Sequence, residues 1–182
     1  MAATRKIDSR RAVPYVVTLA VWLFFFPLAA TADDNWNVCF TPGSDCAGLI
    51  IDQIGLAKTS IMVQAYSFTS APIAQALTDA HHRGVEVRVL LDKSQVSERY
   101  STAKFFANAG IPVWIDDKVA IAHNKVMIID GETVVTGSFN FTRSAQERNA
   151  ENVLILRDVG LADKYIRNWG ARQNVSRAYR PG

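Results

Sequence analysis

The sequence predicts an α/β domain in which helices flank a mixed, largely parallel β-sheet. Helical and strand-like patterns alternate from residue 47 onward, and no long Gly/Ser/Pro linker interrupts them. With 182 residues, of which 49% are apolar and 20% charged, the chain has the size and composition of one globular domain plus a short appendage. We therefore expect residues 33–182 to form a single folded domain.

The first half of this domain is predicted to alternate helices with strands. Apolar residues at helical spacing predict helices over 47–58, 73–83 and 97–109. Gly84 and Gly110 follow the last two helices as C-terminal caps. Runs rich in Val, Ile and aromatic residues predict strands over 60–68, 85–91 and 111–115.

The second half departs from this alternation. Two strand-like runs, 119–129 and 132–137, are joined by Asp130-Gly131, a dipeptide that suits a type I′ hairpin turn. A third strand is predicted over 152–156. A C-terminal helix with one apolar face is predicted over 161–179.

Residues 1–32 have the three-part pattern of a secretory signal peptide. Basic residues ending in Arg10-Arg11 precede an uncharged run over 12–32, which closes with Ala30-Thr31-Ala32, an A-x-A cleavage site. A retained membrane anchor is the alternative, because the 21 uncharged residues are enough to span a bilayer core of about 30 Å. The predicted location is periplasmic or secreted, with membrane attachment if the segment is not cleaved.

The formal charge of +3 does not by itself indicate a polyanionic partner. Residues 1–32 hold four basic residues and one acidic residue, which leaves 16 of each sign in the remaining chain and a net charge of zero. Local basic residues are either ordinary surface charges or contacts for phosphate groups. The candidates for such contacts are Lys93, Arg99, Lys104, Arg143 and Arg148.

Two cysteines bracket a short turn. Cys39 and Cys46 flank a segment that contains Pro42-Gly43, a turn signal, and export would place both in an oxidising compartment. A disulfide between them is therefore predicted, with free thiols as the alternative. A zinc site is disfavoured, because only His81-His82 could add nitrogen ligands.

Polar side chains at two-residue spacing predict a site for a phosphodiester. His123 and Lys125 lie two residues apart in a predicted strand and share a face, and Ser138 and Asn140 repeat this spacing after Gly137. An imidazole can attack phosphorus or donate a proton, while ammonium, hydroxyl and carboxamide groups hold the charge that develops on the oxygens. Gly137, which lacks a side chain, lets a ligand or another backbone segment approach closely.

The nearby acidic residues are predicted to differ in role. Ser144-Ala145-Gln146-Glu147 fits a helix capping box, which gives Glu147 a structural part. Glu151 opens the next strand, where a carboxylate could accept from one nitrogen of an imidazole and fix its tautomer. Asp130 is an odd number of residues from His123, at a turn, so its side chain is expected on the opposite face in a structural role.

The pattern His123-x-Lys125-x-x-x-x-Asp130, with Gly137-Ser138-x-Asn140 and Glu151-Asn152, resembles the HxKxxxxD motif and its companions in the phospholipase D superfamily. The resemblance covers nearly all of residues 45–175 and is greatest to small secreted bacterial endonucleases with one copy of the motif. It implies a two-step reaction, in which one histidine forms a phosphohistidine while a second protonates the leaving oxygen and then activates water. By this resemblance His123 is the histidine, Lys125 and Asn140 hold phosphate oxygens, Ser138 supports the site and Glu151 orients an imidazole.

The implied reaction needs two histidines, whereas the chain has one His-x-Lys, because Arg83 and Gly84 follow His81 and His82 at that spacing. We therefore expect a two-fold homodimer in which both His123 side chains meet at the interface. No metal or other cofactor is expected. The sequence lacks a carboxylate cluster or His/Cys set suited to Mg²⁺ or Zn²⁺, and the family that it resembles works without one.

Three functions are compatible with these residues. The first is a non-specific exported endonuclease acting on DNA or RNA, favoured by the minimal size of the domain. The second is a phospholipase D that hydrolyses membrane phospholipids to phosphatidic acid, a role in lipid degradation. The third is a non-catalytic protein that only binds phosphate-rich ligands.

Overall fold

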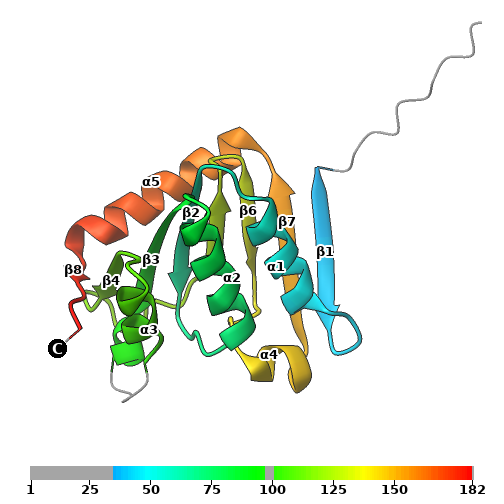
Figure 1. Cartoon of the computed structure of the whole chain (residues 1–182). Helices are drawn as coiled ribbons and strands as arrows, with labels where there is room; N and C mark the ends of the chain where they lie inside the picture. The colour runs from blue at the N-terminus through cyan, green and yellow to red at the C-terminus, as the bar shows by residue number, and fades with distance from the viewer. Residues whose placement is uncertain (1–34, 97–100, 182) are drawn as a thin grey trace, which may run out of the picture. The chain divides into compact units, whose positions relative to one another are not determined.

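An eight-stranded sheet lies at the centre of the computed structural model, which describes residues 35–96 and 101–181 (Figure 1). The strand order is β1-β7-β6-β5-β2-β3-β4-β8. The strands are β1 (Trp36–Thr41), β2 (Ser60–Ala65), β3 (Glu86–Asp92), β4 (Val113–Asp116), β5 (Lys125–Ile129), β6 (Thr133–Gly137), β7 (Glu151–Arg157) and β8 (Arg177–Ala178). The helices are α1 (Cys46–Leu56), α2 (Ala71–His82), the 3₁₀ helix η1 (Lys93–Val96), α3 (Thr102–Asn108), α4 (Arg143–Glu147) and α5 (Val159–Val175).

Helices cover both faces of the sheet, as the alternation of apolar residues requires. On β2, Ile61 and Val63 face the larger core under α1, α2 and α3, and Figure 1 shows α1 and α2 in front of the sheet. On the opposite face, the smaller core under α5 includes Leu90, Ile128 and Trp169. The Trp169 indole N–H donates a 2.9 Å hydrogen bond to the carbonyl of Val63, which ties α5 to the central strand.

The mixed sheet is confirmed, but the expectation that it would be largely parallel is wrong. Among the described strands, only the β2–β3 and β3–β4 pairs are parallel, and the other pairings are antiparallel. Parallel pairing requires a crossover connection, which α2 and α3 supply. The connection from β5 to β6 is a tight turn, and the connection from β6 to β7 contains the short helix α4, so the chain reverses direction at each step.

The hairpin between β5 and β6 turns at the predicted dipeptide. Asp130 and Gly131 both have positive φ, 54° and 72°, as a type I′ turn requires. The Glu132 N–H closes the turn with a 3.1 Å hydrogen bond to the carbonyl of Ile129.

Three segments differ from the sequence prediction. Residues 119–124 are not part of a strand, because their backbone groups bond to the end of β3: the Ala122 N–H donates to Asp92 Oδ2 at 2.7 Å, and Lys93 Nζ donates to the Val119 carbonyl at 3.1 Å. The strand β1 was not predicted, and it pairs antiparallel with β7 at the edge of the sheet. Near the C-terminus, α5 ends at Val175 instead of continuing to 179, and β8 pairs with β4.

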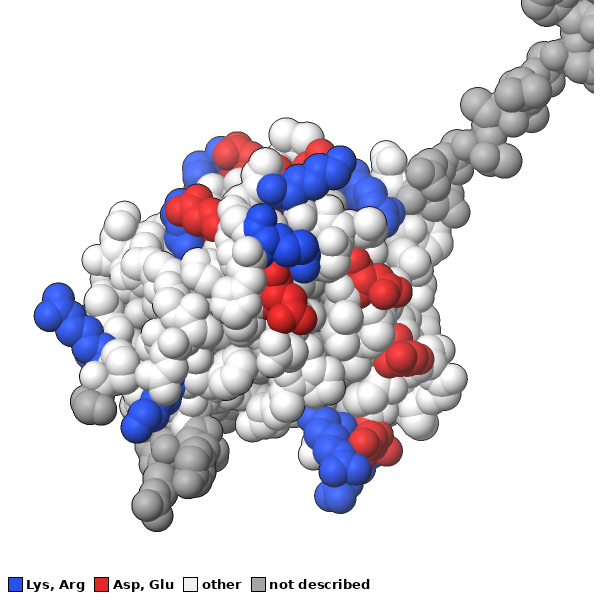
Figure 2. All heavy atoms as spheres, viewed as in Figure 1, with Lys and Arg blue, Asp and Glu red and all other residues white. Residues whose placement is uncertain are grey.

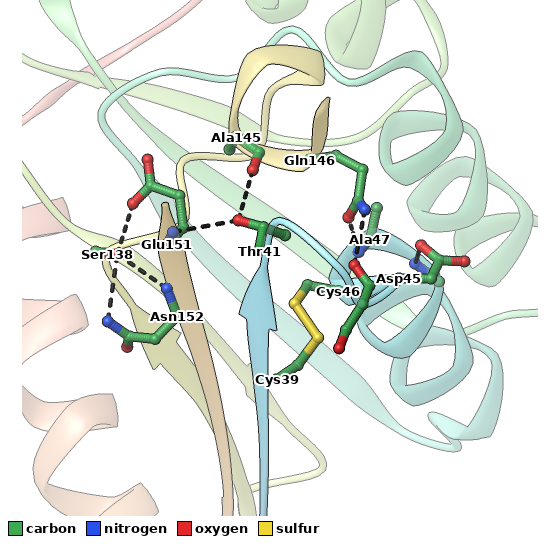
Figure 3. The surroundings of a disulfide bond; sticks show 12 residues. Cys39, Thr41, Asp45, Cys46, Ala47, Ser138, Ala145, Gln146, Glu151 and Asn152 are labelled. Atoms are coloured by element: carbon green, nitrogen blue, oxygen red, sulfur yellow. Dashed lines mark hydrogen bonds between the residues drawn. A yellow bond between two sulfur atoms is a disulfide. The ribbon is translucent and has the colours of Figure 1, made fainter. Parts of the chain in front are cut away.

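The predicted disulfide is confirmed. Cys39 on β1 and Cys46 at the start of α1 are bonded, with their Cα atoms 5.6 Å apart (Figure 3). The bond closes the turn between the edge strand and the first helix, beside the part of β1 that pairs with β7.

The predicted signal peptide or anchor, residues 1–32, lies outside the described residues. None of the helices described between residues 35 and 181 combines the length and the apolar character needed to cross a bilayer.

Candidate active site

A polar pocket opens at one end of three strands of the sheet, where β5 and β7 begin and β6 ends. These three strands are antiparallel neighbours in the order β7-β6-β5, so residues far apart in the sequence meet at these strand ends. The pocket is lined by His123, Lys125, Gly137, Ser138, Asn140 and Glu151. All five residues assigned catalytic parts by the sequence analysis are in this set.

His123 and Lys125 meet although His123 precedes the strand. Lys125 is the first residue of β5, and the residue is only 7% exposed. Its Nζ lies 3.0 Å from Nε2 and 3.1 Å from Nδ1 of His123, and it donates a further hydrogen bond to the His123 carbonyl at 3.1 Å. A neutral imidazole has one lone-pair nitrogen, so the ammonium can donate to one ring nitrogen at a time.

The Tyr66 ring packs against the imidazole of His123. Its ring centroid lies 4.6 Å from that of His123, and Lys125 Nζ lies 5.3 Å from the centre of the Tyr66 ring. The Tyr66 N–H also donates to the carbonyl of Asn124 at 2.8 Å, which ties the end of β2 to the residue between His123 and Lys125. The sequence analysis gave Tyr66 no role, because it falls within the strand predicted over 60–68, whose pattern carries no signal of this contact.

Burial lowers the pKa of the Lys125 ammonium below its ordinary value of 10.5, and the negative charge of Glu151 opposes this effect. The lysine therefore gives up its proton more readily than an exposed lysine would. In its ammonium form Lys125 is a hydrogen-bond donor and a positive charge in the pocket.

A hydrogen-bonded chain holds the opposite wall of the pocket (Figure 3). Ser138 Oγ donates to Glu151 Oε2 at 2.5 Å and accepts from the Asn152 N–H at 3.1 Å. Asn149 Nδ2 donates to the other carboxylate oxygen of Glu151 at 2.8 Å, and the Glu151 N–H donates to Thr41 Oγ1 at 3.2 Å. These hydrogen bonds orient the Glu151 carboxylate through both of its oxygens.

Gly137 is required by the approach of a neighbouring backbone. Its φ is 146°, and a Cβ atom built there would lie 2.2 Å from the Asn152 carbonyl oxygen. The same carbonyl accepts from the N–H groups of Ser138 and Phe139 at 3.2 and 3.3 Å. Gly137 therefore lets β7 approach the turn that presents Ser138.

Asn140 contributes an unpaired polar atom. Its Oδ1 is buried and has no hydrogen-bond partner in the part of the chain that the structure describes. Buried polar atoms are almost always paired, so an unpaired one in a pocket is available to a ligand or to another chain.

Asp130 lies away from the pocket. Its carboxylate accepts from the backbone N–H groups of Lys58, Thr59 and Ser60 at 2.8–3.2 Å and from the Thr59 hydroxyl at 2.9 Å. Burial opposes ionisation, but these hydrogen bonds outweigh it and hold the pKa of Asp130 below its ordinary value of 3.8. The carboxylate joins the β5–β6 turn to the segment that enters β2.

The capping box predicted for residues 144–147 is wrong. The helix α4 starts earlier, so Thr142 is its N-cap and accepts from the Ala145 N–H at 3.1 Å. Glu147 instead pairs with Arg143 at 2.8 Å on the exposed surface. Such an exposed pair contributes little to stability.

The candidate basic residues form no continuous band. Arg143 is engaged by Glu147, and Lys93 Nζ donates to a backbone carbonyl. Lys104 and Arg148 are exposed, and Arg99 lies outside the described residues. On the face shown in Figure 2, basic side chains lie beside acidic ones in small groups, and wide uncharged areas separate the groups. Across 35–96 and 101–181, no group of three or more His, Cys, Asp and Glu side chains is arranged for a metal ion.

Known proteins are similar to this chain in sequence and in fold. Residues 50–171 match the family described as "Cardiolipin synthase, PLD-like domain". A phospholipase D of Rickettsia prowazekii is 44% identical over 154 residues, which cover 85% of this chain and 75% of the relative. A mitochondrial cardiolipin hydrolase of Xenopus laevis is 33% identical over 151 residues, covering 79% and 71%. The crystal structure of Nuc from Salmonella typhimurium, a phospholipase D family member, superimposes with a TM-score of 0.77 at 39% identity, covering 80% of this chain and 98% of Nuc.

The fold and these similarities define the class of protein. The chain belongs to the phospholipase D superfamily, whose members are phosphodiesterase hydrolases.

Proposed function

We propose that this chain hydrolyses phosphodiesters without a metal ion, through a phosphohistidine on His123, and that its substrate is DNA or RNA. The observation that carries the proposal is the pocket in which His123, Lys125 and Asn140 lie together with the Ser138–Glu151 pair. Every lining side chain is polar, which suits an anionic backbone better than an acyl chain.

In the first proposed step, a ring nitrogen of His123 attacks phosphorus and forms an N–P bond. The bond from phosphorus to the leaving oxygen breaks, and that oxygen takes a proton from a second imidazolium. Lys125 and Asn140 hold the non-bridging oxygens and stabilise the charge that grows on them. Glu151 orients an imidazole, and Ser138 holds Glu151.

In the second step, the second imidazole takes a proton from water, and the water oxygen attacks phosphorus. The N–P bond breaks and returns His123 to its starting state, and the product of this step is a phosphomonoester, because the alcohol was already formed in the first step. The second imidazole comes from a second copy of the chain, so the active form is a homodimer with both His123 residues at a shared site. The hydrogen-bonding capacity left open on Asn140 fits an incomplete site of this kind.

Nucleic acid is favoured because the sequence resembles small secreted endonucleases with one copy of the motif, and because the matched residues cover 98% of Nuc, a structure of similar minimal size. Phospholipid is the second candidate, because relatives at 44% and 33% identity are named phospholipase D and mitochondrial cardiolipin hydrolase. The same site chemistry serves both substrates. We also propose that residues 1–32 direct export, a location in keeping with the Cys39–Cys46 disulfide.

The test is a parallel turnover assay, in EDTA, on plasmid DNA and on phosphatidylcholine vesicles. We expect DNA nicking that is lost in His123→Ala and retained in His82→Ala, an exposed histidine on α2. Radiolabelled phosphate should be trapped on the wild-type protein and not on His123→Ala. Lipid turnover without DNA nicking would show that the protein is a phospholipase and not a nuclease. Loss of all activity in EDTA would contradict the metal-free mechanism.

A further inference from the structure

Another pocket, the Phe105 pocket, lies between the first turn of α2 and the helix α3. Its volume is about 220 Å³, which is below the ~300–1,000 Å³ of pockets that hold drug-sized ligands. A cavity of this size has room for one small ring system. The residues that line it include Thr69, Ser70, Ala71, Gln75, Thr102 and Phe105.

The lining of the Phe105 pocket is neutral. Among the described residues that line it, none carries a charged side chain; hydroxyl and amide groups supply the polar part, and Phe105 with two alanines supplies the apolar part. A site for a phosphate group balances the negative charge with Lys or Arg, as Lys125 does in the candidate active site. The Phe105 pocket therefore suits an uncharged ring with polar edges better than it suits a phosphate.

The first turn of α2 offers this pocket a side-chain hydroxyl more than it offers backbone donors. The N–H groups of Thr69 and Ser70 donate to the Phe141 carbonyl at 2.9 Å, and Pro72 has no N–H. Ser70 is the N-cap residue, yet its side chain makes no capping hydrogen bond, and the residue is only 7% exposed. Because buried polar groups are almost always paired, this hydroxyl is available to a polar edge of a ligand.

Phe105 is the aromatic residue of the pocket, and the core supports it. Phe105 is 43% exposed, and its ring centroid lies 5.6 Å from that of Phe106. Phe106 is fully buried and packs in turn on Phe68, with ring centroids 5.2 Å apart. The Thr102 hydroxyl, one helical turn before Phe105, donates to the Phe68 carbonyl. Phe105 is therefore an exposed aromatic ring on an anchored helix, and such rings stack well on nucleobases.

Gln75 adds a polar group with a fixed orientation. Its Nε2 donates to Asp79 Oδ1 at 2.8 Å, which leaves the amide oxygen as an acceptor. The Ser70 hydroxyl can both donate and accept. Every nucleobase carries donors and acceptors on its edges, so these two side chains can bond to the edge of a stacked ring.

Two chain segments connect the Phe105 pocket with the candidate active site. The Phe141 carbonyl, which accepts from the Thr69 N–H, belongs to the residue after Asn140, and Asn140 lines the active site. Tyr66, which packs on His123, precedes Thr69 by three residues, so the Cα atoms of Tyr66 and Thr69 are at most about 11 Å apart. Figure 1 shows α3 and α4 at the same, lower end of the sheet.

We propose that the Phe105 pocket binds a nucleobase of the substrate strand, close to the phosphate held by His123 and Lys125. The inference rests on the proposed function, because it requires a nucleic acid chain across the active site. The base stacks on Phe105, and its edge bonds to Ser70 and Gln75. A base in a duplex is already stacked and paired, so the pocket takes its base from a single-stranded segment. Stacking tolerates every base, which agrees with cleavage that has no sequence preference.

The experiment compares two single-stranded substrates of equal length and charge, oligothymidylate and an oligomer of abasic deoxyribose phosphates. We expect the wild-type kcat/KM to be at least about 5-fold higher for oligothymidylate, which corresponds to one base–aromatic stack of ~1 kcal/mol. Phe105→Ala and Phe105→Leu should lose this preference, whereas Phe105→Trp, which keeps an aromatic ring, should retain it. The matched control is Leu56→Ala on α1, because Leu56 is 66% exposed and does not line the pocket. Phe105→Leu keeps an apolar side chain, so it remains informative if Phe105→Ala does not fold.

Fluorescence anisotropy with labelled forms of the same two oligomers separates this inference from the proposed function. Tighter binding of oligothymidylate by the wild type, lost in Phe105→Ala, supports the base pocket even if no nucleic acid is cleaved. Cleavage of both oligomers by the wild type with equal kcat/KM overturns the base pocket and leaves the proposed function intact. A preference for oligothymidylate that persists in Phe105→Leu also overturns it. So does a Phe105→Ala variant that loses only the turnover of phosphatidylcholine vesicles, because that result would assign the pocket to an acyl chain.

Discussion

Ser138 Oγ donates a 2.5 Å hydrogen bond to Glu151 Oε2 and so joins the end of β6 to the start of β7. The other carboxylate oxygen accepts from Asn149 Nδ2 at 2.8 Å. Both oxygens are therefore held before any substrate or second chain is present. A carboxylate fixed in this way can orient an imidazole without having to lose side-chain freedom during the reaction.

Glu151→Gln is expected to lower kcat by about 10²–10⁴-fold, the usual contribution of acid–base positioning, with a smaller change in KM. The amide keeps the shape of the side chain but removes the charge that orients and stabilises an imidazolium. Steady-state kinetics on DNA would measure the effect. Glu147→Gln is the matched control, because Glu147 pairs only with exposed Arg143 and should leave kcat unchanged. Equal kcat values for Glu151→Gln and wild type would remove Glu151 from the mechanism.

The pH profile of kcat/KM is expected to fall on its alkaline side below pH 10.5. Burial lowers the pKa of Lys125, so the ammonium is lost at a lower pH than in an exposed lysine. Because Glu151 raises this pKa, removing its charge in Glu151→Gln should move the alkaline limb to still lower pH. A limb that does not move in this variant would show that another group titrates there.

Gly137→Ala is expected to reduce both turnover and thermal stability. The added Cβ would overlap the Asn152 carbonyl oxygen, and φ at this position is 146°, so the turn must shift and carry Ser138 with it. Differential scanning calorimetry and the nicking assay measure the two effects. Gly170→Ala is the control, since nothing lies within 4 Å of its added Cβ in α5, and helix propensity favours alanine there by up to about 1 kcal/mol.

Asp130→Asn is expected to lower the free energy of unfolding at pH 7 by about 1–3 kcal/mol, because an amide cannot accept all the hydrogen bonds that the carboxylate accepts. The pKa of Asp130 is depressed in the folded state, so ionisation stabilises the fold above the ordinary value of 3.8, and this stabilisation disappears as the pH falls through the folded-state pKa. Urea unfolding from pH 7 down to pH 3 should show wild type and variant converging in acid. A constant difference over this range would mean that the carboxylate charge is not involved.

Reduction of the Cys39–Cys46 disulfide is expected to destabilise the protein by about 2–3 kcal/mol, from the entropy of the loop that it closes in the unfolded chain. Denaturant midpoints with and without dithiothreitol would measure the loss. The double variant Cys39→Ser with Cys46→Ser should unfold at the midpoint of the reduced protein and be insensitive to dithiothreitol. A midpoint of the wild-type protein that does not move on reduction would contradict the prediction.

Several elements could be predicted because their signals are local. The helices that became α1 and α2 show apolar spacing over about three turns, and the β5–β6 turn shows its Asp130-Gly131 dipeptide. The pairing of Cys39 with Cys46 depends on a short loop, so it too was accessible. In each case the interacting residues are close together in the sequence.

Elements that depend on distant partners were missed or misplaced. The strand β1 exists because it pairs with β7, more than a hundred residues later, and residues 119–124 leave the strand conformation because they bond to Asp92 and Lys93. Whether β5, β6 and β7 run parallel or antiparallel to their neighbours likewise depends on which strands they pair with. Periodicity within a segment carries no information on any of these choices.

The candidate site divides in the same way. Residue types, their spacing and the resemblance to the phospholipase D superfamily together singled out His123, Lys125, Ser138, Asn140 and Glu151, because the chemistry of a phosphodiester restricts which side chains can serve. Only the tertiary structure decided that Tyr66 packs on His123, and that the Asn152 carbonyl lies where a side chain at position 137 would have to fit. These contacts join segments separated by many residues, and they form only when hydrophobic burial brings the strands into one sheet.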